Sequence, residues 1–190
     1  CGACEEECPL GIEYIDKIRG LSYEEIALRG GGINNSASLL RTTSEDDLFE
    51  QAMQRINEVI SYGTGALEIK SGYGLDTESE LKMLRVVRRI RETSKLTIRA
   101  TFLGAHSVPP EYRKEQTKYV DKVITEMLPK VADEGLADFI DVFCDHGFFT
   151  VDETDRILKA AAVYGIRPKI HANELGLSGG IQVGVKNRAL

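Results

Sequence analysis

From residue 67 onward, short runs of β-branched and apolar residues alternate with longer stretches whose apolar residues recur at helical spacing. The short runs predict four strands, at residues 67–70, 96–102, 139–143 and 169–171. A helical stretch follows each of them. This repeated order of strand, loop and helix requires a parallel sheet, because parallel neighbours can only be joined through a crossover.

Two parallel architectures compete, a doubly wound open sheet and a (β/α)₈ barrel. The doubly wound open sheet usually carries a glycine-rich phosphate-binding motif after a strand. No such motif follows any predicted strand here. Polar residues instead follow the strand ends, which share one face of a barrel. They are Tyr73, His106, the stretch 144–146, His171 and Glu174. We therefore predict a TIM-like α/β barrel. It is a partial one, since a closed barrel takes about 250 residues and this chain has 190.

Helices are also predicted at residues 44–62, 114–133, 151–164 and 179–188. Ser44 is expected to cap the first of these. A further helix should begin after the turn at residues 71–74. Asp76 or Thr77 would cap it, with Glu80 as the third-position partner of Thr77. A helix starting at Ser22 should stop at the three glycines 30–32.

The composition excludes several classes of protein. With 28% charged residues and a net charge of −6, the chain offers no basic stripe for nucleic acid. No apolar run approaches the ~20 residues that cross a membrane. The acidic, cysteine-rich start lacks the pattern of a signal peptide. We therefore expect a cytoplasmic protein that binds neither nucleic acid nor membrane.

His171 and Glu174 are the strongest candidates for chemistry. A histidine that leaves a barrel strand is well placed to bind a metal ion, and a carboxylate three residues later can transfer protons. The alternative is a histidine that only bonds backbone at a strand end. His106 lies in a stiff loop with room for a ligand, and the alternative is a loop histidine that only caps a backbone carbonyl. His146 is expected to have a structural or outer-shell role. Lys70 is expected to form a buried ion pair with a carboxylate of a neighbouring strand.

Five motifs then occur in the order and spacing of one known family. They are residues 22–26 with 30–33, 68–75, 101–106 with 109–112, 141–144 and 171–174. Over residues 12–190 the chain resembles the imidazolonepropionases, which are cyclic-amide hydrolases of the amidohydrolase superfamily.

This resemblance implies a hydrolase that opens the ring of 4-imidazolone-5-propanoate with water to give N-formimidoyl-glutamate in histidine degradation. His171 corresponds to a ligand of the single zinc or iron ion. Glu174 corresponds to the catalytic carboxylate that also contacts the substrate. Tyr73, His106 and Tyr23 correspond to substrate-binding residues.

The family also has a His-x-His pair, a substrate-binding arginine, a later histidine and a metal-binding aspartate, and none of them has a counterpart here. We therefore expect the chain to be inactive alone. The alternative is a non-catalytic half-barrel that needs a partner chain, including a second copy, because its open strand edges favour association.

Residues 1–11 form a separate cysteine-rich segment ahead of the barrel part at 12–190. Cys1, Cys4 and Cys8, followed by Pro9, resemble the tail of a bacterial ferredoxin cluster motif. A small iron–sulfur protein is thus a third hypothesis. An extraneous segment is the preferred interpretation, because no companion motif follows.

Overall fold

The computed structural model describes residues 33–190. Its strands are β1 (Ala66–Lys70), β2 (Thr97–Ala105), β3 (Phe139–Cys144), β4 (Arg167–Pro168) and β5 (His171–Ala172). Every ladder is parallel, in the order β1-β2-β3-β4, and β5 also pairs with β3. The predicted parallel sheet alternating with helices is confirmed. This α/β fold is consistent with part of a TIM-like barrel.

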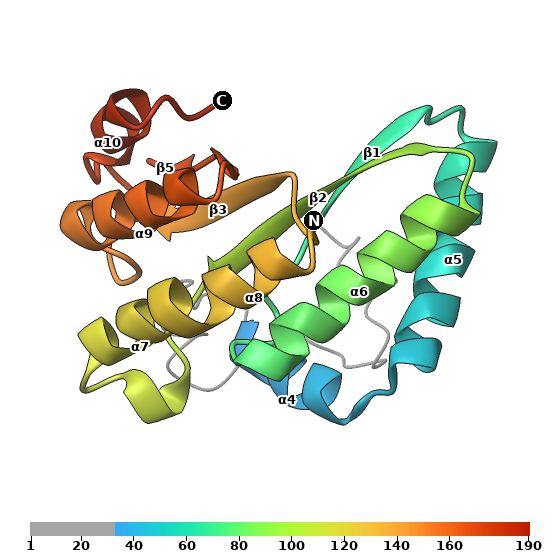
Figure 1. The fold of residues 1–190 in the computed structure, drawn as a ribbon, viewed down its shortest axis with the longest axis horizontal. Coiled ribbons are helices and arrows are strands. Elements are labelled where there is room, and N and C mark those ends of the chain that lie inside the picture. The colour runs from blue at the N-terminus through green and yellow to red at the C-terminus, as the bar shows by residue number, and fades with distance from the viewer. Residues whose placement is uncertain (1–32) are drawn as a thin grey trace, which may run out of the picture.

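Helices join the strands and cover one side of them (Figure 1). Before β1 come α4 (Ile33–Thr42) and α5 (Glu45–Ser61), and α6 (Thr77–Thr93) joins β1 to β2. The β2–β3 connection contains η1 (Pro110–Tyr112), α7 (Gln116–Lys122), η2 (Val123–Met127) and α8 (Leu128–Asp133). After β3 come α9 (Val151–Val163) and, beyond β5, α10 (Gly180–Lys186).

The core lies between the sheet and these helices. The predicted apolar stripe of α6 is fully buried, at Leu81, Leu84, Val87 and Ile90. It belongs to the same cluster as Phe102 of β2. Burying each such side chain contributes about 1.5–3 kcal/mol, so this packing fixes α6 against the strands.

Two predicted elements differ from the structure. The strand predicted at residues 169–171 is replaced by two short pairings, β4 and β5, with residues 169 and 170 between them. The Lys169 N–H still donates to the carbonyl of Ile140 at 2.7 Å, so the regular ladder stops only after that bond. The helix at 114–133 begins at Gln116 and contains the π-helical turn η2, in which the N–H of Leu128 donates to the carbonyl of Val123. Pro129 explains that turn, because a proline cannot donate the ordinary helical bond.

The predicted helix caps are partly right. The Ser44 side chain accepts a hydrogen bond from the Asp47 N–H at 3.1 Å. Asp76, not Thr77, caps α6, accepting from Ser79 N–H at 2.9 Å. The predicted partnership of Thr77 and Glu80 is wrong, because Glu80 turns into the interior.

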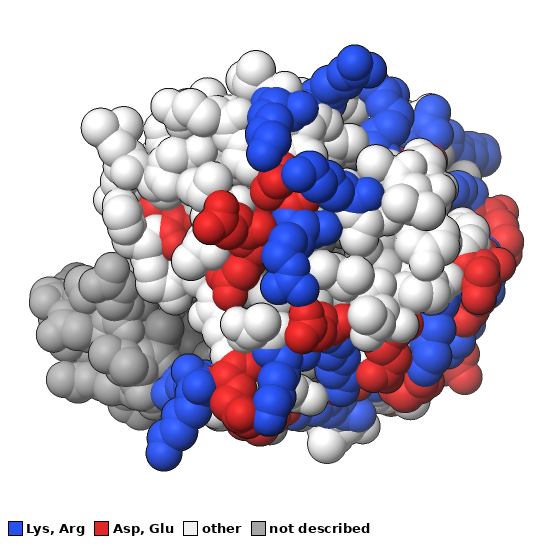
Figure 2. All heavy atoms as spheres, turned by 60° about the vertical axis from the view of Figure 1, so that its left-hand side comes forward, with Lys and Arg blue, Asp and Glu red and all other residues white. Residues whose placement is uncertain are grey.

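No helix within residues 33–190 is long and apolar enough to cross a membrane. The face of the molecule in Figure 2 mixes acidic and basic side chains instead of carrying one basic stripe. Several predictions lie outside the described residues. They concern Tyr23, the helix from Ser22 with its stop at 30–32, and the segment 1–11 with Cys1, Cys4 and Cys8.

Candidate functional site

Three of the predicted site residues come together beyond the carboxyl ends of neighbouring strands. The rings of Tyr73 and His106 meet edge to face, with their centroids 5.2 Å apart. The rings of His106 and His171 have centroids 6.4 Å apart. The parallel topology explains the cluster, since β1, β2 and β5 end at the same edge of the sheet.

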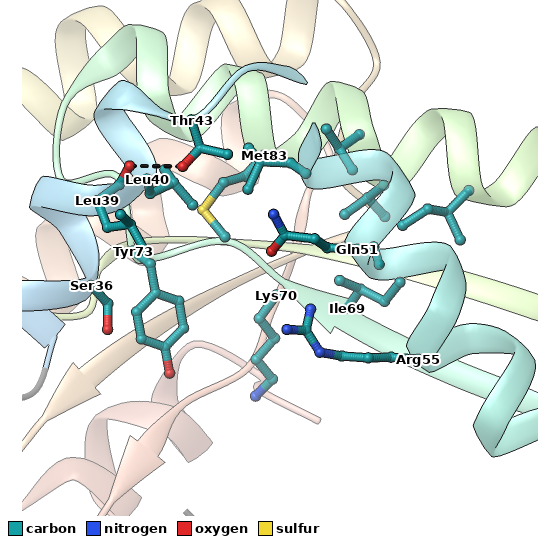
Figure 3. A pocket seen from close by; sticks show the side chains of 15 residues that line it. Ser36, Leu39, Leu40, Thr43, Gln51, Arg55, Ile69, Lys70, Tyr73 and Met83 are labelled. Carbon is teal, nitrogen blue, oxygen red and sulfur yellow. Dashed lines mark hydrogen bonds between the residues drawn. The ribbon is translucent and has the colours of Figure 1, made fainter. Parts of the chain in front are cut away.

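Tyr73 also borders a pocket of about 580 Å³ enclosed by α4, α5, β1 and α6. The inner wall is apolar, and Lys70, Arg55 and Gln51 add polar groups. Figure 3 shows the Tyr73 hydroxyl and the Lys70 ammonium pointing in the same direction. Burial raises the pKa of Tyr73 above its usual value, so its hydroxyl remains protonated and can donate a hydrogen bond at neutral pH.

The loop that carries Tyr73 is held by Glu80, a fully buried carboxylate of α6. Its oxygens accept hydrogen bonds from the N–H groups of Gly72 at 2.8 Å, Gly74 at 2.8 Å and Leu75 at 3.0 Å. Burial raises the pKa of Glu80, while these backbone donors act in the opposite direction. This residue was not predicted to serve the site.

Gly72 allows the loop to approach the next strand closely. Its φ is +104°, a conformation that residues with a side chain rarely adopt. A Cβ atom there would lie 2.8 Å from the carbonyl oxygen of Leu103. The sequence prediction that glycines let the backbone turn and present Tyr73 agrees with this geometry.

His106 is anchored to the same loop. Its Nδ1 lies 3.0 Å from the carbonyl oxygen of Gly72, which can only accept a hydrogen bond. Nδ1 must therefore carry a proton. Burial lowers the pKa of His106, so the ring is neutral at pH 7 and Nε2 keeps its lone pair.

His171 is set beside a buried carboxylate of β3. Its Nδ1 lies 2.9 Å from Oδ2 of Asp141, close enough for an ion pair although the ring N–H is not aligned for a hydrogen bond. Lys70 Nζ donates to the same oxygen at 2.8 Å. The predicted ion pair of Lys70 is present, but its partner lies on β3, across β2, and not on the strand next to β1. This arrangement leaves Nε2 of His171 available to a ligand.

A second charged group lines the inner side of the strands. Lys169 Nζ donates to Glu68 Oε2 at 2.5 Å, and the Thr101 hydroxyl donates to Glu68 Oε1 at 2.5 Å. Glu68 and Lys169, with Asp141 and His171, border an open space of about 420 Å³. Charged side chains on the inner side would be unfavourable in a dry core, so this side faces polar surroundings.

The described residues do not form a complete metal site. Among residues 33–190, no three histidine, cysteine, aspartate or glutamate side chains lie together as ligands. His171 can supply one ligand, whereas catalytic zinc sites commonly use three from the protein. Glu174 follows β5 and its side chain is exposed. His146, predicted to be structural, lies against Gly176 in the loop after β5.

Comparison with curated proteins gives consistent matches over this whole region. A protein of Christiangramia forsetii is 54% identical over 178 residues, which make up 94% of this chain. Proteins of Flavobacterium johnsoniae and Burkholderia cenocepacia are 53% and 46% identical over the same length. All three are imidazolonepropionases. The resemblance predicted from the five motifs is therefore supported by homologues.

The chain spans 43–44% of the length of these imidazolonepropionases. No family model matches it. None of these three relatives is a ferredoxin, so the resemblance of residues 1–9 to a cluster motif has no support.

Proposed function

We propose that this chain forms part of an imidazolonepropionase-type hydrolase, which opens the ring of 4-imidazolone-5-propanoate with water to give N-formimidoyl-glutamate. The observation that carries the proposal is the cluster of Tyr73, His106 and His171 at the strand ends. It lies in a segment that is 54% identical to an imidazolonepropionase. The substrate is small, and the site needs neither nucleic acid nor membrane.

Tyr73 and His106 bind the substrate in complementary ways, Tyr73 as a hydrogen-bond donor and His106 as an acceptor. The protonated hydroxyl of Tyr73 donates to a carbonyl or carboxylate oxygen of the substrate. Neutral His106 accepts at Nε2, because its Nδ1 is bound to Gly72. Tyr23 adds a further contact, as the motif at residues 22–26 implies. Together they orient a cyclic amide with both donor and acceptor groups.

Glu174 transfers the proton. Its side chain is exposed in the loop after β5, three residues beyond His171. A carboxylate there can take a proton from water and return one to the leaving nitrogen. This role matches its position in the motif 171–174.

His171 supplies one ligand to a divalent metal ion, zinc or iron. Its ring is held at Nδ1 beside Asp141, which supports binding through Nε2. Such an ion lowers the pKa of bound water and polarises an amide carbonyl. Residues 33–190 hold no group of three such ligands, and the resemblance places the remaining ligands in motifs that have no counterpart here, so we expect the chain to be inactive alone.

A second candidate follows from the free edge of the sheet. Among the described strands, β1 pairs only with β2, and its other edge has no partner. Such an edge favours association with another strand. In this alternative the chain is a non-catalytic half-barrel whose partner chain, including a second copy, completes the site.

A chimera tests the proposal directly. The imidazolonepropionase of C. forsetii would carry this chain's sequence over the 178 matched residues. We expect turnover, measured as a fall in substrate absorbance, and about one bound metal ion per chain. His171→Ala should abolish or strongly reduce both the turnover and the metal content. His146→Asn, the matched control at another strand end, should leave both intact. A folded chimera without turnover would refute the proposal.

The 190-residue chain by itself separates the remaining alternatives. Absence of turnover and of stoichiometric metal supports incompleteness, whereas turnover in an oligomer supports completion by a partner chain. Visible absorption in an anaerobic preparation would indicate an iron–sulfur cluster at Cys1, Cys4 and Cys8. A colourless preparation excludes it.

A further inference from the structure

Asp145 is a buried carboxylate that the proposed chemistry does not use. It follows β3 directly and is only 4% exposed. Its Oδ2 accepts hydrogen bonds from the N–H groups of Glu174 at 2.8 Å and Leu175 at 2.9 Å. Its Oδ1 accepts from the N–H of His146 at 2.8 Å. Asp145 thus ties the end of β3 to the loop that carries Glu174.

This contact begins where the backbone pairing ends. The ladder between β3 and β5 contains the pairs Phe143↔His171 and Cys144↔Ala172 and goes no further. The next residue, Asn173, has a φ of +58° and turns the chain out of the strand. The Asp145 carboxylate then takes the place of the missing ladder bonds and holds the chain after the turn.

The side chain of Glu174 has no comparable anchor. It is exposed, and it forms no hydrogen bond or ion pair with the residues that the structure describes. Its position relative to His171 therefore depends on its backbone. The two amide bonds to Asp145 hold that backbone, and hydrogen bonds to a charged acceptor are about twice as strong as neutral ones.

A second contact closes the loop further along. The Ser178 hydroxyl donates to the carbonyl of Cys144 at 2.8 Å, and the Ser178 N–H donates to Asn173 Oδ1 at 3.2 Å. The loop from Glu174 to Ser178 is therefore hydrogen-bonded at both of its ends to residues at the end of β3. Of these contacts, only those to Asp145 involve Glu174 itself.

We propose that Asp145 is a positioning residue, which sets the catalytic carboxylate of Glu174 through the backbone of residues 174 and 175. The inference rests on the proposed role of Glu174. It predicts that loosening Asp145 reduces turnover without removing the metal ligand His171, because that residue lies on β5 before the turn. Catalysis is sensitive to such small displacements of a reacting group.

The first test measures hydrogen exchange in the 190-residue chain and requires no activity. Asp145→Ser is used here, because a serine is too short to reach the Glu174 and Leu175 N–H groups, whereas an asparagine can keep its one oxygen toward both of them. We expect the Glu174 and Leu175 amides to exchange roughly 10–100-fold faster, from the usual strength of a hydrogen bond to a charged group. Exchange at the wild-type rate would overturn the proposal.

The second test measures kinetics in the chimera. Asp145→Ser should lower kcat by roughly 10–100-fold, with a much smaller change in KM and with unchanged metal content. The matched control is Asp138→Ser. Asp138 lies at the opposite end of β3 and also accepts a backbone N–H, that of Ala100 at 2.8 Å. An equal fall in kcat for both variants would reveal a general loss of stability and overturn the proposal.

Two further outcomes are separable. If Asp145→Ser does not fold, Asp145→Asn replaces it, since an asparagine keeps the size of the side chain and removes the charge that strengthens these hydrogen bonds. A chimera without any turnover refutes the proposed function, while the exchange rates still decide whether Asp145 holds the loop.

Discussion

Nδ1 of His106 lies 3.0 Å from the carbonyl oxygen of Gly72, and this contact determines which nitrogen of the ring is free. Since the carbonyl can only accept, the proton is on Nδ1 and the lone pair is on Nε2. Burial lowers the pKa of His106, which keeps the ring neutral. The histidine therefore offers an acceptor, not a positive charge, to whatever binds beside Tyr73.

The tautomer can be measured directly. In ¹⁵N-labelled chain at pH 7, we expect the His106 ring to give the shifts of an Nδ1–H tautomer, with a titration midpoint below the ordinary value near 6.5. His146, a histidine outside the cluster, serves as the reference in the same spectrum. An Nε2–H tautomer for His106 would contradict the hydrogen bond to Gly72 and the acceptor role.

Glu80 of α6 should be the residue on which the conformation of the Tyr73 loop depends most. Glu80→Gln exchanges one oxygen for an NH₂ group, so at least one buried backbone donor among Gly72, Gly74 and Leu75 loses its partner. We expect a loss of roughly 1–3 kcal/mol in the free energy of unfolding, measured by urea denaturation. Glu78→Gln on the exposed side of α6 is the control and should change stability by less than about 0.5 kcal/mol.

The contrast between Glu80 and Tyr73 shows which parts of the site can be predicted from the sequence alone. Tyr73, His106 and His171 were predicted to meet, because strand ends can be read from periodicity and a parallel sheet aligns them. Glu80 was misassigned, because its spacing from Thr77 matches a capping box locally. Its real partners at residues 72–75 are decided by how α6 packs, which no local pattern encodes.

The same limit applies to Asp145 and to the strand around His171. An aspartate after a strand is common, and only the folded chain shows that it reaches the backbone of Glu174. The gap between β4 and β5, at residues 169 and 170, has no signal in the sequence of residues 169–171. Local patterns thus located the site, while the contacts that position its residues required the tertiary structure.

Asp138 should make the free energy of unfolding fall at low pH. Burial alone would raise its pKa, but the N–H of Ala100 and the guanidinium groups of Arg99 and Arg91 outweigh that effect and lower it. A lowered pKa stabilises the fold above the unfolded value near 3.9. That contribution is lost as the pH falls through the folded value.

Acid unfolding followed by circular dichroism tests this dependence. Asp138→Asn should reduce stability at pH 7 and flatten the fall of stability below pH ~4. Asp152→Asn on α9 provides the control. An unchanged acid profile in Asp138→Asn would show that its ion pairs with Arg91 and Arg99 contribute nothing to folding.

Lys70 and Asp141 should be coupled, because the buried carboxylate depends on its cation. Asp141 is 1% exposed, and its Oδ1 has no partner among the described residues. Lys70→Met leaves the Asp141 carboxylate with His171 beside it and without the Lys70 ammonium. It should therefore lower the free energy of unfolding more than Asp141→Asn, which removes the charge. Lys70 is about one-third exposed while Asp141 is buried, so solvent screens part of the interaction and we expect a coupling energy of about 0.5–3 kcal/mol. A double-mutant cycle by urea denaturation measures it, and the double variant should be more stable than Lys70→Met. Strict additivity of the two single variants would mean that solvent, not Lys70, compensates the buried carboxylate.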